Sequence, residues 1–195
     1  MACWDINGKA LGQPIYNLLG GKYHEKLRSY TYLYPDPNDK SRRSPFTDPE
    51  KAAESAKAHL DQGFTAIKFD PLIDVMGKED PRETPIDRLQ NGEDVVRAVR
   101  EAVGSNCDIL IGTHGQTTTS SALRFARRIE AFDPLWFEEP VPPENVDEMA
   151  TVANSTTIPV ATGERLSTKY EFRLHQKIDW AARRQNSSYK WKSNY

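Results

Sequence analysis

Short apolar segments that alternate with helical patterns constrain the fold of this chain more than any other feature. The segments are TAIKF at 65–69, DILI at 108–111, LWF at 135–137 and IPVA at 158–161. Apolar runs of this length fit buried parallel strands, and the longer amphipathic stretches between them fit the helices that join such strands. The strand–helix unit recurs about five times, which predicts an α/β fold with a parallel sheet.

The remaining elements are expected from local signals. Two short helices are expected in residues 2–19, because Gly12-Gln13-Pro14 interrupts the helical pattern there. A strand is expected at 26–33, where the side chains alternate, and residues 72–90 are expected to form a long loop. The helices of the repeats are expected at 48–63, 91–103, 122–132 and 145–153.

Two architectures can hold a parallel sheet of this kind. A doubly wound sheet normally carries a glycine-rich phosphate turn, and neither GxGxxG nor GxxxxGK[ST] occurs in the sequence. A (β/α)8 barrel places polar groups over consecutive strand ends, which matches the pattern seen here. We therefore expect a partial (β/α)8 barrel of about the first five units, since a complete barrel takes about 250 residues.

Titratable side chains follow each predicted strand. Asp70 follows the segment that contains Lys68, His114 follows the next segment, Glu138 and Glu139 follow the third, and Glu164 follows the last. The carboxyl ends of parallel strands lie on one face of the sheet, where α/β proteins hold their active sites. The sequence predicts that these side chains share a site, although Glu138 and Glu139 alone would also fit a solvated acidic turn.

Charge and hydropathy exclude several classes of partner. The chain has 26 Lys and Arg against 28 Asp and Glu, a net charge of −2, so we expect neither nucleic acid nor an anionic membrane as a partner. No apolar run approaches the roughly 18 residues of a membrane span, and the amino terminus has no signal pattern. A cytoplasmic location is therefore expected.

Four motifs occur in a fixed order along the chain. They are WDIxGKALG at 4–12 with LLGG at 18–21, GFxAIK at 63–68, FEEP at 137–140 and IPVAxGE at 158–164. Together they resemble the enolase superfamily, in its mandelate racemase and muconate lactonizing branch. The step His114-Gly115 further resembles the acid-sugar dehydratases of that branch, of the galactonate and galactarate dehydratase kind.

The resemblance implies a division of the chain. Residues 1–25 would be the last helices of an α+β capping domain, and residues 26–174 would be a partial barrel like the enolase C-terminal domain. Residues 175–195 would be an aberrant tail, since after Leu174 the sequence has five Lys or Arg against one acid and no further strand pattern. Such a tail is consistent with a shifted or prematurely terminated reading frame.

The resemblance also implies a Mg²⁺ site. Glu138 and Glu164 match the metal ligands of the fourth and fifth barrel strands. The third-strand ligand is usually an Asp two residues before the position of His114, and here that residue is Gly112. Because glycine offers no side-chain oxygen to a hard cation, either His114, Asp70 or a water completes the shell, or the affinity for the metal falls.

Further roles follow from the same resemblance. Lys68 matches a second-strand lysine that acts as a base or contacts the substrate carboxylate. Asp70 stands where a second lysine is usual and is expected to contact the substrate. We expect His114 to be the general acid, since imidazole titrates near neutrality. Glu139 is expected to orient its neighbours and to contact the substrate rather than to bind metal.

The predicted function is that of a Mg²⁺-dependent lyase that removes the α-proton of a sugar-acid carboxylate and eliminates water by a syn or anti route. Two alternatives stay open: a truncated, non-catalytic remnant of such an enzyme, and a racemase or cycloisomerase of the same superfamily. The general base is not assigned. The expected partner is a small-molecule sugar acid, and a homo-oligomer is left open.

Overall fold

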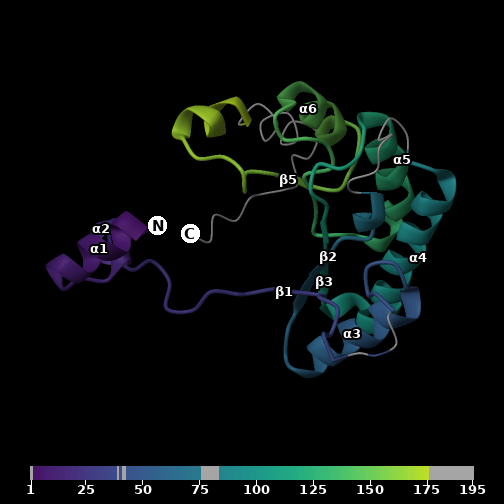
Figure 1. Ribbon diagram of the computed structural model, residues 1–195, viewed down its shortest axis with the longest axis horizontal. Helices are drawn as coiled ribbons and strands as arrows, with labels where there is room; N and C mark the ends of the chain where they lie inside the picture. Colours follow the sequence, from purple (N-terminus) through teal and green to yellow (C-terminus); the bar gives the residue numbers. More distant parts are fainter. Residues whose placement is uncertain (1, 39, 41–42, 76–83, 176–195) are drawn as a thin grey trace. The chain divides into compact units, whose positions relative to one another are not determined.

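The computed structural model describes residues 2–38, 40, 43–75 and 84–175 (Figure 1). Its described residues form two compact units, 2–29 and 30–175, which we treat separately. The predicted division at residues 25 and 174 stays a prediction, and residues 176–195 of the proposed tail lie outside the described part. No helix among the described residues has the length and apolar character needed to cross a membrane.

The first unit contains two short helices, α1 (Ala2–Leu11) and α2 (Ile15–Leu18). They are separated as predicted, because Gly12 adopts a positive φ of 63° and Pro14 precedes the first turn of α2. Gly8 permits a close approach of the two segments, since a Cβ there would lie 2.8 Å from the carbonyl oxygen of Gln13.

The second unit is built on one parallel sheet whose strand order follows the chain, β1-β2-β3-β4-β5. A doubly wound sheet would reverse its strand order at a switch point, whereas consecutive strands that add to one edge form the wall of a barrel. The predicted α/β fold with five strands of a partial barrel is therefore confirmed. The strands are β1 (Thr31–Tyr32), β2 (Ala66–Phe69), β3 (Asp108–Gly112), β4 (Trp136–Glu138) and β5 (Val160–Ala161).

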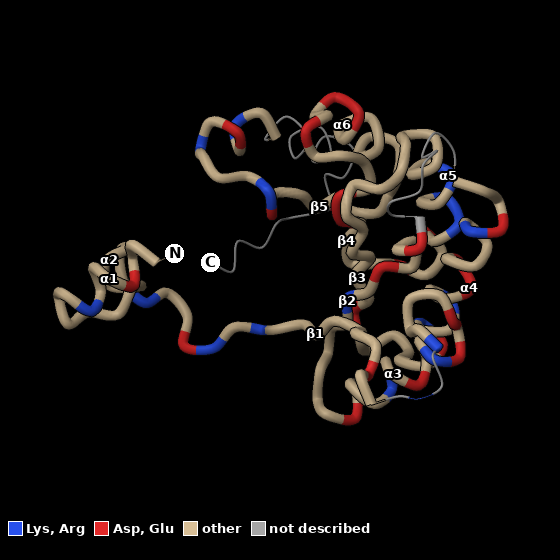
Figure 2. The backbone as a smooth tube through the Cα atoms, viewed as in Figure 1, with Lys and Arg blue, Asp and Glu red and all other residues tan. Residues whose placement is uncertain are grey.

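Four helices cover one side of this sheet, as Figure 1 shows. Each begins at a recognisable signal: Asp48, Thr118 and Asn145 each accept a hydrogen bond from a backbone N–H three residues on, and Pro85 precedes the remaining helix. Basic and acidic residues are interspersed along these helices (Figure 2). The helices are α3 (Pro49–Asp61), α4 (Ile86–Val103), α5 (Thr119–Ile129) and α6 (Val146–Asn154), with 3₁₀ turns η1 (Ile73–Val75), η2 (Gly104–Asn106) and η3 (Glu130–Phe132).

Successive residues of each strand face opposite sides of the sheet, and this alternation positions the site. Ile67, Ile109 and Phe137 are fully buried and belong to the hydrophobic core formed with the helices. The residues next to them in sequence, Lys68 and Glu138 among them, lie on the side away from the helices. In a barrel that side is the interior, so charged side chains there are partly buried and lie close to one another.

The largest differences from the predicted boundaries lie at two places. Of the strand expected at 26–33, only Thr31 and Tyr32 pair with β2, because alternation of side chains gives no strand without a neighbour, and residues up to 29 belong to the other unit. The helix expected at 91–103 begins at Ile86, so the predicted loop 72–90 is shorter than expected. Residues 76–83 of that loop lie outside the described part of the chain.

Candidate active site

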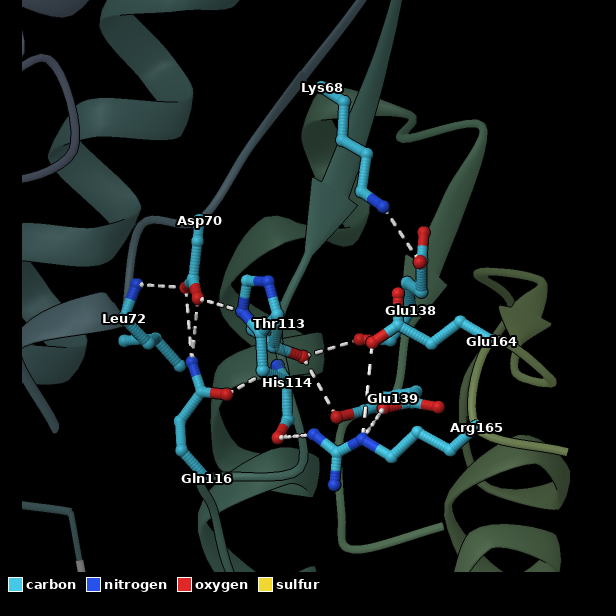
Figure 3. A network of polar contacts seen from close by, with 10 residues as sticks. All are labelled: Lys68, Asp70, Leu72, Thr113, His114, Gln116, Glu138, Glu139, Glu164 and Arg165. Carbon is cyan, nitrogen blue, oxygen red and sulfur yellow. Dashed lines mark hydrogen bonds and ion pairs between the residues drawn. The ribbon is translucent and has the colours of Figure 1, made fainter. Parts of the chain in front are cut away.

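The predicted side chains meet where the strands end (Figure 3). Gly112 at the end of β3 is the register partner of Glu138 at the end of β4, and Lys68 of β2 is the partner of Leu110. Lys68, Gly112 and Glu138 therefore lie on the same face of the sheet. Gly112 and Glu138 lie side by side, and Lys68 lies two residues before them along the strand direction. The parallel register thus brings Lys68 to Glu138 from a distance of 70 residues in sequence.

Lys68 and Glu138 form a partly buried ion pair. Lys68 Nζ lies 2.7 Å from Glu138 Oε1, and the two side chains are only 10% and 14% exposed. The indole Nε1 of Trp136 donates to the other oxygen, Oε2, at 3.0 Å. Lys68 Nζ also lies 5.8 Å and 5.9 Å from the ring centroids of Tyr30 and Tyr32. Each carboxyl oxygen of Glu138 therefore accepts a hydrogen bond. The rings of Tyr30 and Tyr32 form an aromatic wall beside the Lys68 ammonium, and such rings attract a cation.

Asp70 and His114 form a second pair. Asp70 is fully buried, and its Oδ2 lies 2.8 Å from Nδ1 of His114. The same carboxylate accepts hydrogen bonds from the backbone N–H of Leu72 at 2.9 Å and from Nε2 of Gln116 at 2.9 Å and 3.1 Å. These donors fix its orientation. The hydrogen bond from Asp70 raises the pKa of His114 above its usual value, against the opposing effect of burial.

The pairing with Asp70 also determines the tautomer of His114. A carboxylate only accepts, so Nδ1 carries the proton and Nε2 is the nitrogen that can exchange a proton with a ligand. The His114 side chain is 31% exposed, which leaves the ring accessible. Gln116 holds the loop in place, because its side-chain oxygen accepts a hydrogen bond from the backbone N–H of His114.

Glu139 follows β4 in a left-handed backbone conformation, with φ of 39°. Its backbone is held on both sides, since its N–H donates to Ala161 O at 2.9 Å and its carbonyl accepts from Gly115 N–H at 2.8 Å. Its side chain is fully buried, and neither carboxyl oxygen makes a hydrogen bond among the described residues. Arg165 Nε lies 3.4 Å from Oε2. Burial raises the pKa of Glu139 above its usual value, and Arg165 partly opposes this.

Glu164 follows β5 and is less enclosed than the other carboxylates. Its side chain is 49% exposed, and its Oε1 lies 3.9 Å from Arg165 Nε. Arg165 also donates to the carbonyl oxygen of His114 at 2.7 Å. One guanidinium thus connects the ends of β3, β4 and β5, as Figure 3 shows.

The residues present do not fit a Mg²⁺ ion held by three carboxylates. Gly112 brings no oxygen, both oxygens of Glu138 already accept hydrogen bonds, and the carboxylate of Asp70 is taken by His114, Gln116 and Leu72. Within the described residues, no group of three or more His, Cys, Asp or Glu side chains could hold a metal ion. The metal roles of Glu138 and Glu164 stay predictions from the resemblance.

The structure brings together the residues that the sequence singled out, from Lys68 at β2 to Glu164 after β5. It gives Asp70 a role that the sequence did not indicate, as the partner of His114. Sequence reasoning missed Trp136, Gln116 and Arg165, together with the two tyrosines near Lys68. Gln116 and Arg165 each stand beside a predicted residue in a strand-end loop, which is the one signal that could have indicated them.

A parallel α/β sheet wound in chain order, with titratable groups gathered over the strand ends, defines a barrel-type domain with a candidate active site. The chain belongs to the enolase C-terminal domain-like family, whose model matches residues 51–177. The family resemblance drawn from the sequence motifs is thereby confirmed.

Individual relatives agree with this assignment. The chain is 35% identical over 175 residues to a D-gluconate/D-galactonate dehydratase of Picrophilus torridus, covering 88% of this chain and 41% of the relative. It is 37% identical over 177 residues to a D-xylonate dehydratase of Haloferax volcanii, covering 87% and 40%. A crystal structure of a proposed mandelate racemase/muconate lactonizing enzyme from Labrenzia alexandrii has a TM-score of 0.79 and 53% identity, covering 93% and 46%. The chain therefore spans less than half the length of these relatives.

Proposed function

We propose that this site eliminates water from a sugar acid, with His114 as the proton carrier and Lys68 as the contact for the substrate carboxylate. The observation that carries the proposal is the Asp70–His114 pair, with 2.8 Å between Oδ2 and Nδ1. A histidine whose Nδ1 is fixed by a buried carboxylate presents Nε2 as an acid or base near neutral pH.

The reaction removes the proton on the carbon next to the carboxylate and breaks the C–O bond at the following carbon. The electron pair left by the proton forms the C=C bond, and the hydroxyl leaves as water after it receives a proton. In a syn elimination, Nε2 of His114 can take the first proton and deliver it to the hydroxyl on the same face. In an anti elimination, His114 is the acid and a second group is the base.

Lys68 suits the role of substrate contact better than that of base. Its Nζ is 2.7 Å from a Glu138 oxygen and only 10% of the side chain is exposed, so the ammonium is held in an ion pair. An ammonium can attract the substrate carboxylate and the extra negative charge that develops when the α-proton leaves. The proposal makes no use of a metal ion, because Gly112 and the partners of Glu138 do not fit one.

The relatives supply the substrate class. Both curated relatives described above are dehydratases of sugar acids. Since the chain covers only about 40% of those proteins, activity of this polypeptide is part of the proposal. Sugar acids carry the carboxylate for Lys68 and the hydroxyl that His114 would protonate.

The test incubates the purified chain with D-gluconate, D-galactonate and D-xylonate and measures formation of a keto acid. We expect turnover of at least one acid, and a loss of about 100-fold or more in His114→Asn, as for removal of a general acid or base. Lys68→Ala should lose activity, because it removes the proposed contact with the substrate carboxylate. Lys57→Ala, at an exposed lysine on α3, is its matched control and is expected to keep full activity.

Other outcomes would contradict the proposal in different ways. Exchange or inversion at the α-carbon without keto acid would indicate a racemase instead. A chain with a folded circular-dichroism spectrum that converts none of the acids would indicate the non-catalytic alternative. Turnover that survives in His114→Asn would remove His114 from the mechanism.

A further inference from the structure

Gly112 occupies the position from which the family resemblance leads one to expect an aspartate ligand. No positive φ requires a glycine at this position, since Gly112 is absent from the residues with left-handed backbone. The reason for glycine is space. A Cβ at residue 112 would lie 2.3 Å from Cε of Lys68, 3.0 Å from Cγ and 3.2 Å from Cδ. The Lys68 side chain thus crosses directly over the face of Gly112, and any side chain at 112 would displace it.

The consequence of this crossing is the position of the ammonium. With its stem over Gly112, Lys68 reaches the β4 end and places Nζ 2.7 Å from Glu138 Oε1. Trp136 holds the other oxygen of Glu138 at 3.0 Å. A cation that binds Glu138 must therefore remove an ammonium from a pair that is 10% and 14% exposed, and would leave that ammonium close to its own positive charge.

The surroundings of Lys68 Nζ also suit an ammonium group better than a divalent metal ion. The rings of Tyr30 and Tyr32 lie 5.8 Å and 5.9 Å from Nζ, within the range of cation–π attraction. Tyrosine rings in this position offer no carboxylate oxygens to a hard divalent ion, which prefers oxygen ligands in octahedral geometry. The space at Gly112, the ion pair with Glu138 and the rings of Tyr30 and Tyr32 all describe one conformation of the Lys68 side chain, and they agree in favouring an ammonium at this point.

We propose that Lys68 supplies the fixed positive charge of this site in place of a divalent metal ion, and that Gly112 is the residue that admits it. The site then binds an anion beside Lys68 without a metal. Residues 68 and 112 form a coupled pair: a lysine that reaches Glu138 requires glycine at 112, and an aspartate at 112 requires that the lysine be moved. This inference concerns the charge of the site and does not depend on the elimination reaction.

The first experiment titrates Mg²⁺ into the intact chain by calorimetry, with Glu138→Gln beside it. We expect no saturable heat that depends on Glu138, because Lys68 already pairs with that carboxylate. Saturable binding by the unaltered chain that Glu138→Gln abolishes would overturn the inference. It would leave the proposed dehydration untouched, since that is measured separately by keto-acid formation.

The second experiment builds the metal site that the chain lacks. In the double variant Lys68→Ala with Gly112→Asp, the space over residue 112 is free and carboxylates are present at 112, 138 and 164. We expect Mg²⁺ to bind at least 10-fold more tightly than to the unaltered chain. Gly112→Asp alone is the control, and it should not gain binding, because the retained Lys68 ammonium can pair with the new carboxylate.

Folding of each variant is checked by circular dichroism before titration. If the double variant does not fold, Lys68→Ala alone is titrated, and we expect a smaller gain in Mg²⁺ binding because Glu138 loses its ammonium. A folded double variant, or in its place a folded Lys68→Ala, that binds Mg²⁺ no better than the unaltered chain would refute the coupling of Lys68 and Gly112.

Discussion

Replacement of Asp70 by Asn tests the Asp70–His114 pair most sharply. Asn keeps the size of the side chain but turns one oxygen into a donor. At Oδ1 the new amide would meet the N–H of Leu72, now 2.9 Å away, and at Oδ2 it would meet Nδ1 of His114, now 2.8 Å away. Nε2 of Gln116, which donates to both oxygens, would lose a partner in either orientation.

The magnitude follows from these contacts. Asp70 is fully buried, and one or two hydrogen bonds to its charge would be lost. At about 1.5–3 kcal/mol for each hydrogen bond to a charged group, with part of the loss recovered because His114 and Gln116 are not fully enclosed, the free energy of unfolding should fall by about 2–4 kcal/mol. Denaturant unfolding measures this, with Asp94→Asn as the control. Asp94 lies in a partly exposed ion pair with Arg97 on α4, and its replacement is expected to cost no more than about 1 kcal/mol.

The same variant changes a pH dependence with a defined sign. Because Asp70 raises the pKa of His114 in the folded state, the pair stabilises the fold fully below the unfolded-state pKa of about 6.5 and less as pH rises through the higher folded value. In Asp70→Asn this decline should shrink, and NMR titration should show a lower pKa for His114. An unchanged His114 pKa, or a stability loss no larger than that of Asp94→Asn, would refute the pairing.

Three further changes have defined outcomes. Phe137→Ala removes a fully buried ring that packs edge-on to Phe125 with 6.0 Å between centroids, and should cost about 3–5 kcal/mol in denaturant unfolding; a loss below 1 kcal/mol would contradict this. Thr118→Ala removes the cap whose Oγ1 accepts from Ser121 N–H, and should cost about 1 kcal/mol, with an unchanged midpoint as the opposing result. Burial raises the pKa of Glu139, so the wild-type chain should lose stability as the pH rises from the unfolded-state pKa of this carboxyl through the folded-state pKa. Glu139→Gln should remove this loss. Parallel plots of stability against pH for the two chains would argue against it.

Much of the fold follows from burial patterns that the sequence displays. Strands β2, β3 and β4 are largely buried on both faces, and each therefore appears in the sequence as a short apolar run with its polar residues near the carboxyl end. Strand β1 could not be placed in the same way. Its extent depends on pairing with β2 through Thr31 and Tyr32, and the pattern of alternating side chains in residues 26–33 does not contain that information.

The site was predictable to the extent that strand ends determine it. Lys68 and Glu138 stand at positions fixed by the parallel register, and His114 follows the end of β3 by two residues, so their proximity is expected once the strands are assigned. The partner of His114 does not follow, because Asp70 lies 44 residues away and the contact depends on loop geometry. Arg165 and Gln116 lie in irregular loops that have no periodic pattern, and the crossing of Lys68 over Gly112 depends on a side-chain conformation.

The most direct test of the account is the loss of the α-proton of a sugar acid together with formation of keto acid, followed by proton NMR in deuterated water for the intact chain and for His114→Asn. The account predicts that D-gluconate, D-galactonate or D-xylonate loses its α-proton signal with the intact chain at a rate well above that without protein. The rate with His114→Asn should fall to the uncatalysed value. Loss of the α-proton at the same rate in both chains, or in neither, would contradict the claim that the Asp70–His114 pair moves the proton.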